Sequence, residues 1–225
     1  MPTELVNADF AQRAVIATNE LRWVPSPQAG VERRMLDRVG GEVARATSIV
    51  RYAPASVFAE HDHALGEEFL VLEGVFADEH GNYPTGTYVR NPPGSHHSPR
   101  TDSGCTIFVK LRQMTPTENR RIVVDTTKLE WIPGEVDGHW LRDLHSSGQE
   151  GERVTMERLD AGVALPEIEC RGGEEVLLLS GDLCDATGTY GPGTWIRNPA
   201  GYRRVLRSKG GAVYWAKRGH LRTIP

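Results

Sequence analysis

The sequence predicts an all-β protein built from two tandem barrel-like domains. Two observations support this prediction: one long unit of sequence occurs twice, and each copy consists of short strand-like segments separated by turns. The clearest trace of the duplication is GTYVRNPPG, which begins at Gly86 and returns as GTWIRNPAG from Gly193. Six of the nine letters agree, and each mismatch exchanges similar residues.

The repeat extends along most of the chain. RAVIATNELRW from Arg13 matches RIVVDTTKLEW from Arg121 at an offset of 108 residues, and EEFLVLEG from Glu67 matches EEVLLLSG from Glu174 at an offset of 107. A period of this length is too long for a solenoid, whose repeats run roughly 20–50 residues. We therefore expect a duplicated domain in three parts: an N-terminal barrel at 1–112, a linker at 113–120 and a C-terminal barrel at 121–225.

The local pattern within each copy is of the β type. Segments such as TSIVRY, EFLVLEGVF, GTYVRN and CTIFVKL are rich in Val, Ile, Thr, Tyr and Phe, and Gly, Pro, Asn and Asp separate them. No stretch combines a sustained 3.6-residue apolar period with a helix-capping residue. Short strands at roughly ten-residue spacing are typical of a sandwich or a barrel.

Composition narrows the class of protein. The chain is 39% hydrophobic and 25% charged, which suits a globular protein with a buried core. A net charge of −4 gives no basic surface for nucleic acid, and no apolar run approaches the ~20 residues that a membrane span needs. The N-terminus has no apolar run of signal-peptide length. The three cysteines, Cys105, Cys170 and Cys184, form no CxxC pair, so we expect a reduced, cytoplasmic protein.

Four side chains of the first copy have the types and spacing of a metal site. His61 and His63 are two residues apart, so a strand directs both to one face, and Glu67 has the same parity. His97 follows the RNPPG turn, which can direct it toward the same interior. Three imidazoles and a carboxylate suit a divalent transition metal. We expect one such ion per chain, Zn, Fe, Mn or Ni, in the N-terminal barrel.

Two neighbouring residues compete with these assignments. Glu68 lies next to Glu67, but strand parity and the six-residue gap to Gly74 favour Glu67 as the ligand. His96 should point away from His97, and the sequence leaves open whether it lies at the rim of the site or simply on the surface. The other histidines lie in polar or Gly-rich stretches, and we expect them in solvent: His80, His139, His145 and His220.

The metal-site residues also carry a family resemblance. H-x-H-x3-E-x6-G and G-x5-P-x-G-x2-H resemble the two motifs of the cupin superfamily, and they are read here at His61, His63, Glu67 and Gly74, and at Gly86, Pro92, Gly94 and His97. An asparagine that often follows the second motif is replaced by Thr101. More narrowly, three segments resemble the sequences of the ChrR-type cupins: ARATSIVRYAP, GEEFLVLEGVFADEHGNYPTGTYVRNPPGSHH and GCTIFVKLR.

This resemblance implies a fold and two classes of function. The fold is the double-stranded β-helix, or jelly-roll barrel, and two copies make a bicupin. Some ChrR-type cupins are sensor domains of an anti-sigma factor that responds to oxidative stress, and this resemblance implies a sensing or regulatory protein. Related single-domain cupins include acetylacetone-type dioxygenases, which implies an iron enzyme acting on a small diketone-like substrate. The sequence leaves open whether the protein is an enzyme, although it favours a sensing function over a dioxygenase activity.

The implied partners follow from the same comparison. A small-molecule ligand or an oxidant would act at the metal, with neither nucleic acid nor a membrane involved. In the anti-sigma factor, an N-terminal zinc domain with His and Cys ligands binds the sigma factor. About twelve residues precede the first repeat here, with neither His nor Cys among them, so we expect this zinc domain to be absent. A sigma-factor pathway is compatible with the chain, and so is a homodimer.

The second copy lacks most of the ligand set. The positions that match the four ligands hold Ile168, Cys170, Glu174 and Arg204. Arginine stays protonated near neutral pH and cannot ligate a metal. We therefore expect a degenerate C-terminal site in which Arg204 forms an ion pair with Glu174. For Cys170 the sequence favours a small buried side chain over a weak ligand or a redox thiol.

Overall fold

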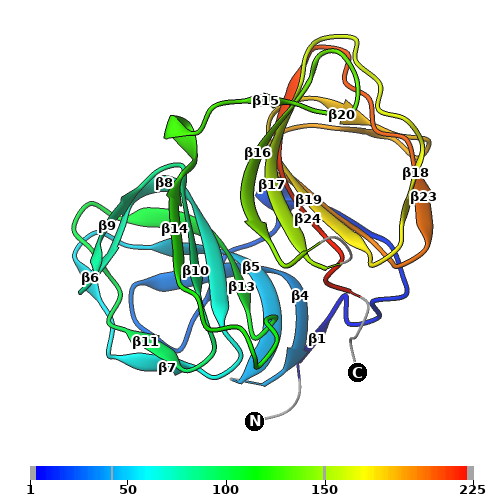
Figure 1. The fold of residues 1–225 in the computed structure, drawn as a ribbon. Helices are drawn as coiled ribbons and strands as arrows, with labels where there is room; N and C mark the ends of the chain where they lie inside the picture. The colour runs from blue at the N-terminus through cyan, green and yellow to red at the C-terminus, as the bar shows by residue number, and fades with distance from the viewer. Residues whose placement is uncertain (1–3, 42, 149–150, 222–225) are drawn as a thin grey trace. The chain divides into compact units, whose positions relative to one another are not determined.

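The computed structural model describes residues 4–41, 43–148 and 151–221 of the 225-residue chain. It confirms an all-β fold of two tandem barrels, which form two compact units (Figure 1). The first unit holds the residues up to Ala8 together with Leu21–Lys128, and the second holds Asp9–Glu20 together with the chain from Leu129 onwards. Within the described residues, no helix has the length and apolar character needed to cross a membrane.

The first unit is an antiparallel barrel. Along its main sheet the strands are β1 (Glu4–Val6), β4 (Val31–Gly40), β5 (Ala44–Tyr52), β13 (Cys105–Leu111), β8 (Glu67–Asp78), β10 (Thr87–Asn91) and β14 (Ile122–Asp125). Shorter elements complete it: β3 (Val24–Pro25), β6 (Ser56–Val57), β7 (His61–His63), β9 (Gly81–Pro84), β11 (Ser95–His97), β12 (Arg100–Thr101) and the 3-10 turn η2 (Thr126–Lys128). β7 and β11 form a separate two-stranded ladder, seen at the lower edge of this barrel in Figure 1.

Alternation along the strands builds the core of the first unit. Phe69 and Val71 are two residues apart on β8 and point inward together, and they cluster with Ile107 and Val109 of β13. The rings of Phe69 and Phe76 lie 4.7 Å apart between centroids. Burying side chains of this size stabilises a fold by about 1.5–3 kcal/mol each.

The second unit repeats this architecture. Along its main sheet the strands are β15 (Ile132–Pro133), β16 (His139–Ser146), β17 (Arg153–Leu159), β24 (Ala212–Arg218), β19 (Glu174–Gly181), β22 (Thr194–Asn198) and β2 (Ala14–Ala17). Its shorter elements are β18 (Ile168–Cys170), β20 (Leu183–Cys184), β21 (Thr189–Tyr190), β23 (Tyr202–Arg204) and the 3-10 turn η1 (Thr18–Glu20). β18 pairs with β23 as β7 pairs with β11, and Val176, Leu178 and Ile196 belong to its core.

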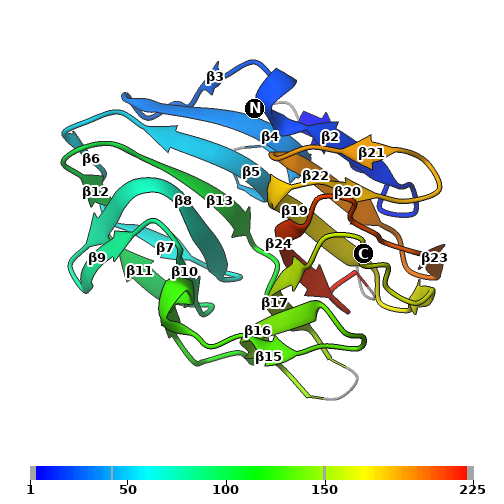
Figure 2. The ribbon, with the colours of Figure 1, turned by 90° about the horizontal axis from the view of Figure 1, so that it is seen from above.

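Each barrel is completed by a strand that the repeat would assign to the other copy. β14 pairs with β10 in the first unit, and β2 pairs with β22 in the second, where Figure 2 shows the two strands side by side. Arginines at the start of these strands make equivalent contacts. Arg121 Nε donates to Asn91 Oδ1 at 3.0 Å, and Arg13 Nε donates to Asn198 Oδ1 at 2.8 Å.

The compact units therefore differ from the contiguous ranges 1–112 and 121–225. Asp9–Glu20 lies with the second unit, and the chain through Lys128 lies with the first. Part of the segment 113–120 also packs on the first unit, where Met114 is buried. Sequence repeats do not reveal this exchange, because both copies begin with the same strand, and trading equivalent strands leaves the order of motifs unchanged.

Candidate metal centre in the first barrel

The structure brings the four candidate ligands together. One ligand atom from each of His61, His63, Glu67 and His97 lies within 4.8 Å of the others. The three imidazole centroids are 4.8–5.0 Å apart. β7 supplies two histidines, β11 supplies the third, and Glu67 is the first residue of β8. The antiparallel pairing of His61 with His97 sets the histidines opposite one another.

The chemistry of these atoms fits a metal ion. The Nε2 atoms of His63 and His97 are buried and have no hydrogen-bond partner in the part of the chain that the structure describes, although each lies 3.5 Å from a carboxylate oxygen of Glu67. A buried polar atom without a partner is costly, and coordination is one way to satisfy it. His61 is exposed, whereas the other three side chains are buried, so the cluster has one open side.

Asp78 orients His97 from outside the cluster. Its carboxylate can only accept hydrogen bonds, so His97 Nδ1 donates to it, at 3.2 Å, and Nε2 is left facing the other ligands. Tyr83 also donates to Asp78, at 2.7 Å. Burial alone would raise the pKa of Asp78, but hydrogen bonds from His97, Tyr83 and the His80 amide outweigh it and lower the pKa to about 2. Asp78 is therefore a carboxylate at any ordinary pH.

The two buried histidines differ in their ease of protonation. Burial lowers the pKa of His63 and outweighs the attraction of Glu67, so this ring stays neutral more readily. Burial also opposes charge on His97, but its hydrogen bond with Asp78 raises its pKa. A neutral imidazole is the form that ligates a metal.

Replacing Asp78 by asparagine should weaken metal binding without removing a ligand. The variant loses the charge that holds His97 in the ligating tautomer, and such outer partners typically contribute 10–100-fold in metal affinity. We expect a loss of about that size in a competition titration with a chelator. Asp125→Asn, at a half-buried position of β14 whose carboxylate contacts Thr127 and Lys128, is the control and should bind metal as the parent does. Equal affinities for the two variants would contradict the role of Asp78.

The repeated RNP turn positions the carboxylate of Glu67. Asn91 Nδ2 donates to Glu67 Oε2 at 3.1 Å, and the Oδ1 atom of the same amide accepts a hydrogen bond from Arg121 Nε. Gly94 has a φ of 80°, which suits glycine, and its amide donates to the backbone carbonyl of His63 at 2.9 Å. The turn therefore fixes both Glu67 and the strand that carries two histidines.

The two competing residues lie outside the cluster. Glu68 points to the other face of β8, where it accepts hydrogen bonds from Tyr88 and Arg90, both at 2.7 Å. His96 is exposed and lies 3.7 Å from Glu60. The geometry thus agrees with the preference for Glu67 and places His96 on the surface.

A cavity of about 350 Å³ adjoins the cluster inside the first barrel. His61, His63 and Glu67 form part of its wall. The apolar wall comes mainly from β4, β5 and β13, and its members include Val31, Val50, Val109 and Leu111. Two polar side chains that the sequence did not indicate, Arg33 and Tyr52, also line it. A small organic molecule fits a space of this size.

The family comparison agrees with this geometry. A family model described as the ChrR Cupin-like domain matches the chain twice, at residues 11–115 and 119–222. The chain belongs to the ChrR cupin-like family. Comparison with curated proteins gives no significant match.

Solved structures with the same fold support a bicupin architecture. A proposed dioxygenase from Nostoc punctiforme superposes with a TM-score of 0.78 at 15% identity, covering 95% of this chain and 85% of the other. A proposed glyoxylate-induced protein from Pseudomonas aeruginosa gives 0.77 at 14% identity, covering 95% and 91%. Oxalate decarboxylase from Bacillus subtilis gives 0.61 at 10% identity, covering 91% and 76%. At these identities the likeness establishes the fold alone.

The second cupin barrel fills the equivalent site with an ion pair. Arg204 donates to both carboxylate oxygens of Glu174, at 2.6 and 2.9 Å, which confirms the pairing expected from the sequence. Arg218 adds a hydrogen bond to Glu174 at 2.8 Å. Cys170 is buried, its Sγ lies 3.8 Å from the same carboxylate, and its pKa is raised to about 12, chiefly by burial. Asn198 donates to Glu174 at 3.1 Å, as Asn91 does to Glu67.

The sequence did not reveal the rest of this polar cluster. Glu157 contacts Arg218, Tyr214 and His139, and the pair Glu157–Arg218 occupies the positions of Val50 and Leu111 in the first barrel, at the 107-residue offset. Two apolar residues that line the cavity of the first barrel are thus replaced by a charged pair inside the second barrel. The expectation that the remaining histidines are solvated is wrong for three of them, which are partly or fully buried beside carboxylates: His139, His145 and His220.

Glu174 gives the second barrel a defined sensitivity to acid. Burial alone would raise its pKa, but the charges of Arg204 and Arg218 outweigh burial and lower the pKa from 4.5 to about 2. The carboxylate therefore contributes stability that is fully present above about pH 4.5 and is lost progressively as the pH falls toward 2. We expect the stability difference between the parent and Glu174→Gln to be constant at neutral pH and to shrink below about pH 4.5 in urea titrations. A difference independent of pH down to about 3 would contradict this linkage.

Proposed function

We propose that the first barrel binds one divalent transition metal through His61, His63, Glu67 and His97, and that the protein uses it for oxygen-dependent chemistry on a small molecule. The observation that carries the proposal is the position of the cluster beside a cavity: three of the four residues line the 350 Å³ cavity. A metal held there would be reachable by an organic substrate. A closed structural site would need no such space.

The donor set supports reactive chemistry. Three imidazoles and one carboxylate leave one or two positions open on an octahedral ion, and a bound ion would polarise an oxygen atom of the substrate. The chain's own residues would orient the substrate, since the cavity wall combines apolar side chains with polar ones such as Arg33 and Tyr52. The likeness to the proposed dioxygenase from Nostoc punctiforme is consistent with this class of reaction.

Sensing is the second candidate. The family model, which describes the ChrR Cupin-like domain, favours it. In that case the cavity would bind a ligand or admit an oxidant without turnover, and the response would be a change of conformation or of partner, such as a member of a sigma-factor pathway. The two candidates share the metal centre and differ in whether the cavity occupant is converted.

The test begins with metal content and ends with turnover. Protein purified without oxygen is analysed by elemental mass spectrometry, and oxygen consumption is then measured with small diketones and keto acids. Near-stoichiometric iron with substrate-dependent oxygen uptake would support the enzyme. A bound metal without turnover of any candidate would favour sensing, and the absence of bound metal would overturn both.

A further inference from the structure

Arg33, in the wall of the cavity of the first barrel, has no hydrogen-bond or ion-pair partner among the described residues. The cavity lies beside the metal cluster, and the Nε atom of Arg33 is buried. The side chain is half-buried, and a polar atom withdrawn from water without a partner is unfavourable. Such a group is usually kept where something else satisfies it.

The strand pattern shows that Arg33 faces inward. Its neighbours on β4 belong to the outer surface: Glu32 pairs with Arg51 at 2.6 Å, and the Arg34 guanidinium lies 4.2 Å from the ring centroid of Trp23. Side chains alternate along a strand, so Arg33 shares the interior face with Val31. Both line the cavity.

Tyr52 supplies a second polar group on the same wall. Val31 pairs with Tyr52 and Arg33 pairs with Val50, so Arg33 and Tyr52 are diagonal neighbours, about 7–8 Å apart and within reach of long side chains. The Tyr52 hydroxyl has no hydrogen-bond partner among the described residues. Burial, with a smaller effect of Glu67, raises its pKa well above the ordinary value, so the hydroxyl stays a donor.

The charge of the cavity favours an anion. Arg38 and Arg112 also line it, although Arg38 lies 3.4 Å from Glu4. On the acidic side, Glu67 belongs to the metal cluster and Asp62 is exposed. A divalent ion in the cluster would add to the positive charge.

The second barrel provides an internal comparison. At the equivalent positions it holds Leu141 for Arg33 and Leu159 for Tyr52, and it has lost three of the four metal-ligand types. The cation, the hydroxyl and the histidines therefore occur together in one barrel and are missing together from the other.

We propose that the cavity takes a small organic carboxylate, whose anionic group binds Arg33 and accepts a hydrogen bond from Tyr52 while the rest of the molecule faces His63 and Glu67. This inference rests on the proposed metal centre and names its substrate class. It favours a keto acid or a similar enolisable acid over the neutral diketone that the family resemblance implies.

A matched pair of probes separates the two classes. Acetoacetate and acetylacetone are close in size and both carry a 1,3-dicarbonyl group, but only acetoacetate is an anion. Their binding to the metal-loaded protein is measured by calorimetry for the parent, Arg33→Met, Arg33→Lys and the control Arg120→Met, which removes an exposed charge of the same unit. Metal content is measured for every sample.

The expected result is a preference for acetoacetate that depends on Arg33. A hydrogen bond to a charged group contributes about 1.5–3 kcal/mol, so Arg33→Met should weaken acetoacetate binding roughly 10–100-fold and leave acetylacetone unchanged. Arg33→Lys should recover part of the loss, and Arg120→Met should behave as the parent.

Two outcomes separate this inference from the metal centre. Stoichiometric metal with equal binding of the two probes, or with acetoacetate binding indifferent to Arg33→Met, would overturn the carboxylate site and leave the metal centre standing. A protein that takes up no metal but still binds acetoacetate through Arg33 would overturn the proposed function and keep the anion site. A protein that takes up no metal and does not bind acetoacetate would overturn both.

Discussion

Replacing His97 by alanine should abolish stoichiometric metal binding. The imidazole is buried, Asp78 holds its Nδ1, and its Nε2 is one of the four clustered ligand atoms, so the substitution removes a donor from the centre. Outer-sphere changes alone cost 10–100-fold in affinity, and the loss of a ligand should exceed about 100-fold. Elemental analysis after dialysis against a weak chelator measures the change.

The neighbouring histidine provides a matched control. His96→Ala removes the same chemical group from an exposed position on the same strand, where its nearest charged partner is Glu60. This variant should keep the metal content and affinity of the parent. Equal metal loss in both variants would indicate general damage to β11, and full retention in His97→Ala would remove His97 from the ligand set.

Replacing Glu174 by glutamine should strongly destabilise the second barrel. The substitution keeps the shape of the side chain but leaves the buried Arg204 without a counter-charge, while Arg218 keeps its ion pair with Glu157. Removing one partner of a buried ion pair typically costs about 3–5 kcal/mol. Urea unfolding followed by tryptophan fluorescence measures it, because Trp195 and Trp215 are both buried in this unit.

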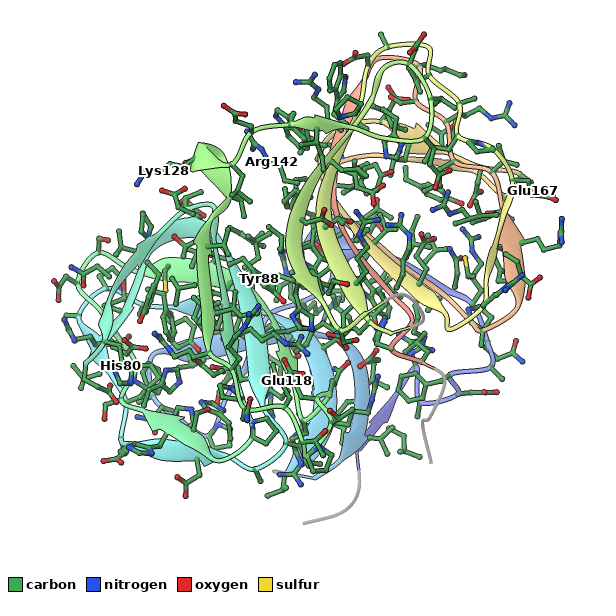
Figure 3. The ribbon with its side chains drawn as sticks, in the orientation of Figure 1. His80, Tyr88, Glu118, Lys128, Arg142 and Glu167 are labelled. Carbon is green, nitrogen blue, oxygen red and sulfur yellow. The ribbon has the colours of Figure 1, made fainter. Side chains whose placement is uncertain are left out.

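A surface ion pair next to this one is the control. Arg203, adjacent to Arg204, pairs with Glu167, and both side chains are largely exposed. Figure 3 shows Glu167 pointing outward from the edge of the second barrel. Glu167→Gln should leave the unfolding midpoint nearly unchanged, since exposed pairs are screened by water and salt. A destabilisation of Glu174→Gln below about 1 kcal/mol would show that water or a rearranged network satisfies Arg204.

The fold was largely predictable because its signals are local and repeated. Alternating apolar residues, Gly- and Pro-rich turns and the recurrence of GTYVRNPPG as GTWIRNPAG each depend on a few neighbouring residues. The strand exchange was not predictable in this way. Pairing of β2 with β22 joins residues about 180 positions apart, and no local pattern distinguishes it from pairing within one copy.

The metal cluster was predictable for a similar reason, and its surroundings were not. His61, His63 and Glu67 are fixed by spacing on one short segment, and His97 by its turn. Arg33 and Tyr52 come from β4 and β5, where they alternate with surface residues and resemble any exposed arginine or tyrosine. Arg218 appears in the sequence as an ordinary charged residue near the C-terminus, because its burial depends on Glu157 and Glu174, both distant along the chain.

The exchanged strand β2 also has a consequence for the order in which the protein can fold on the ribosome. Ala14–Ala17 is made before most of the first barrel, but its partner Thr194–Asn198 is made after that barrel and after most of the second. At about 5–20 residues per second, roughly 10–40 seconds of synthesis separate the two. The first barrel can close once β14 has emerged, whereas β2 stays without its sheet until β22 has been made. Ribosome-stalled chains that end before β22 should therefore show protease sensitivity at β2 beside an already protected first barrel.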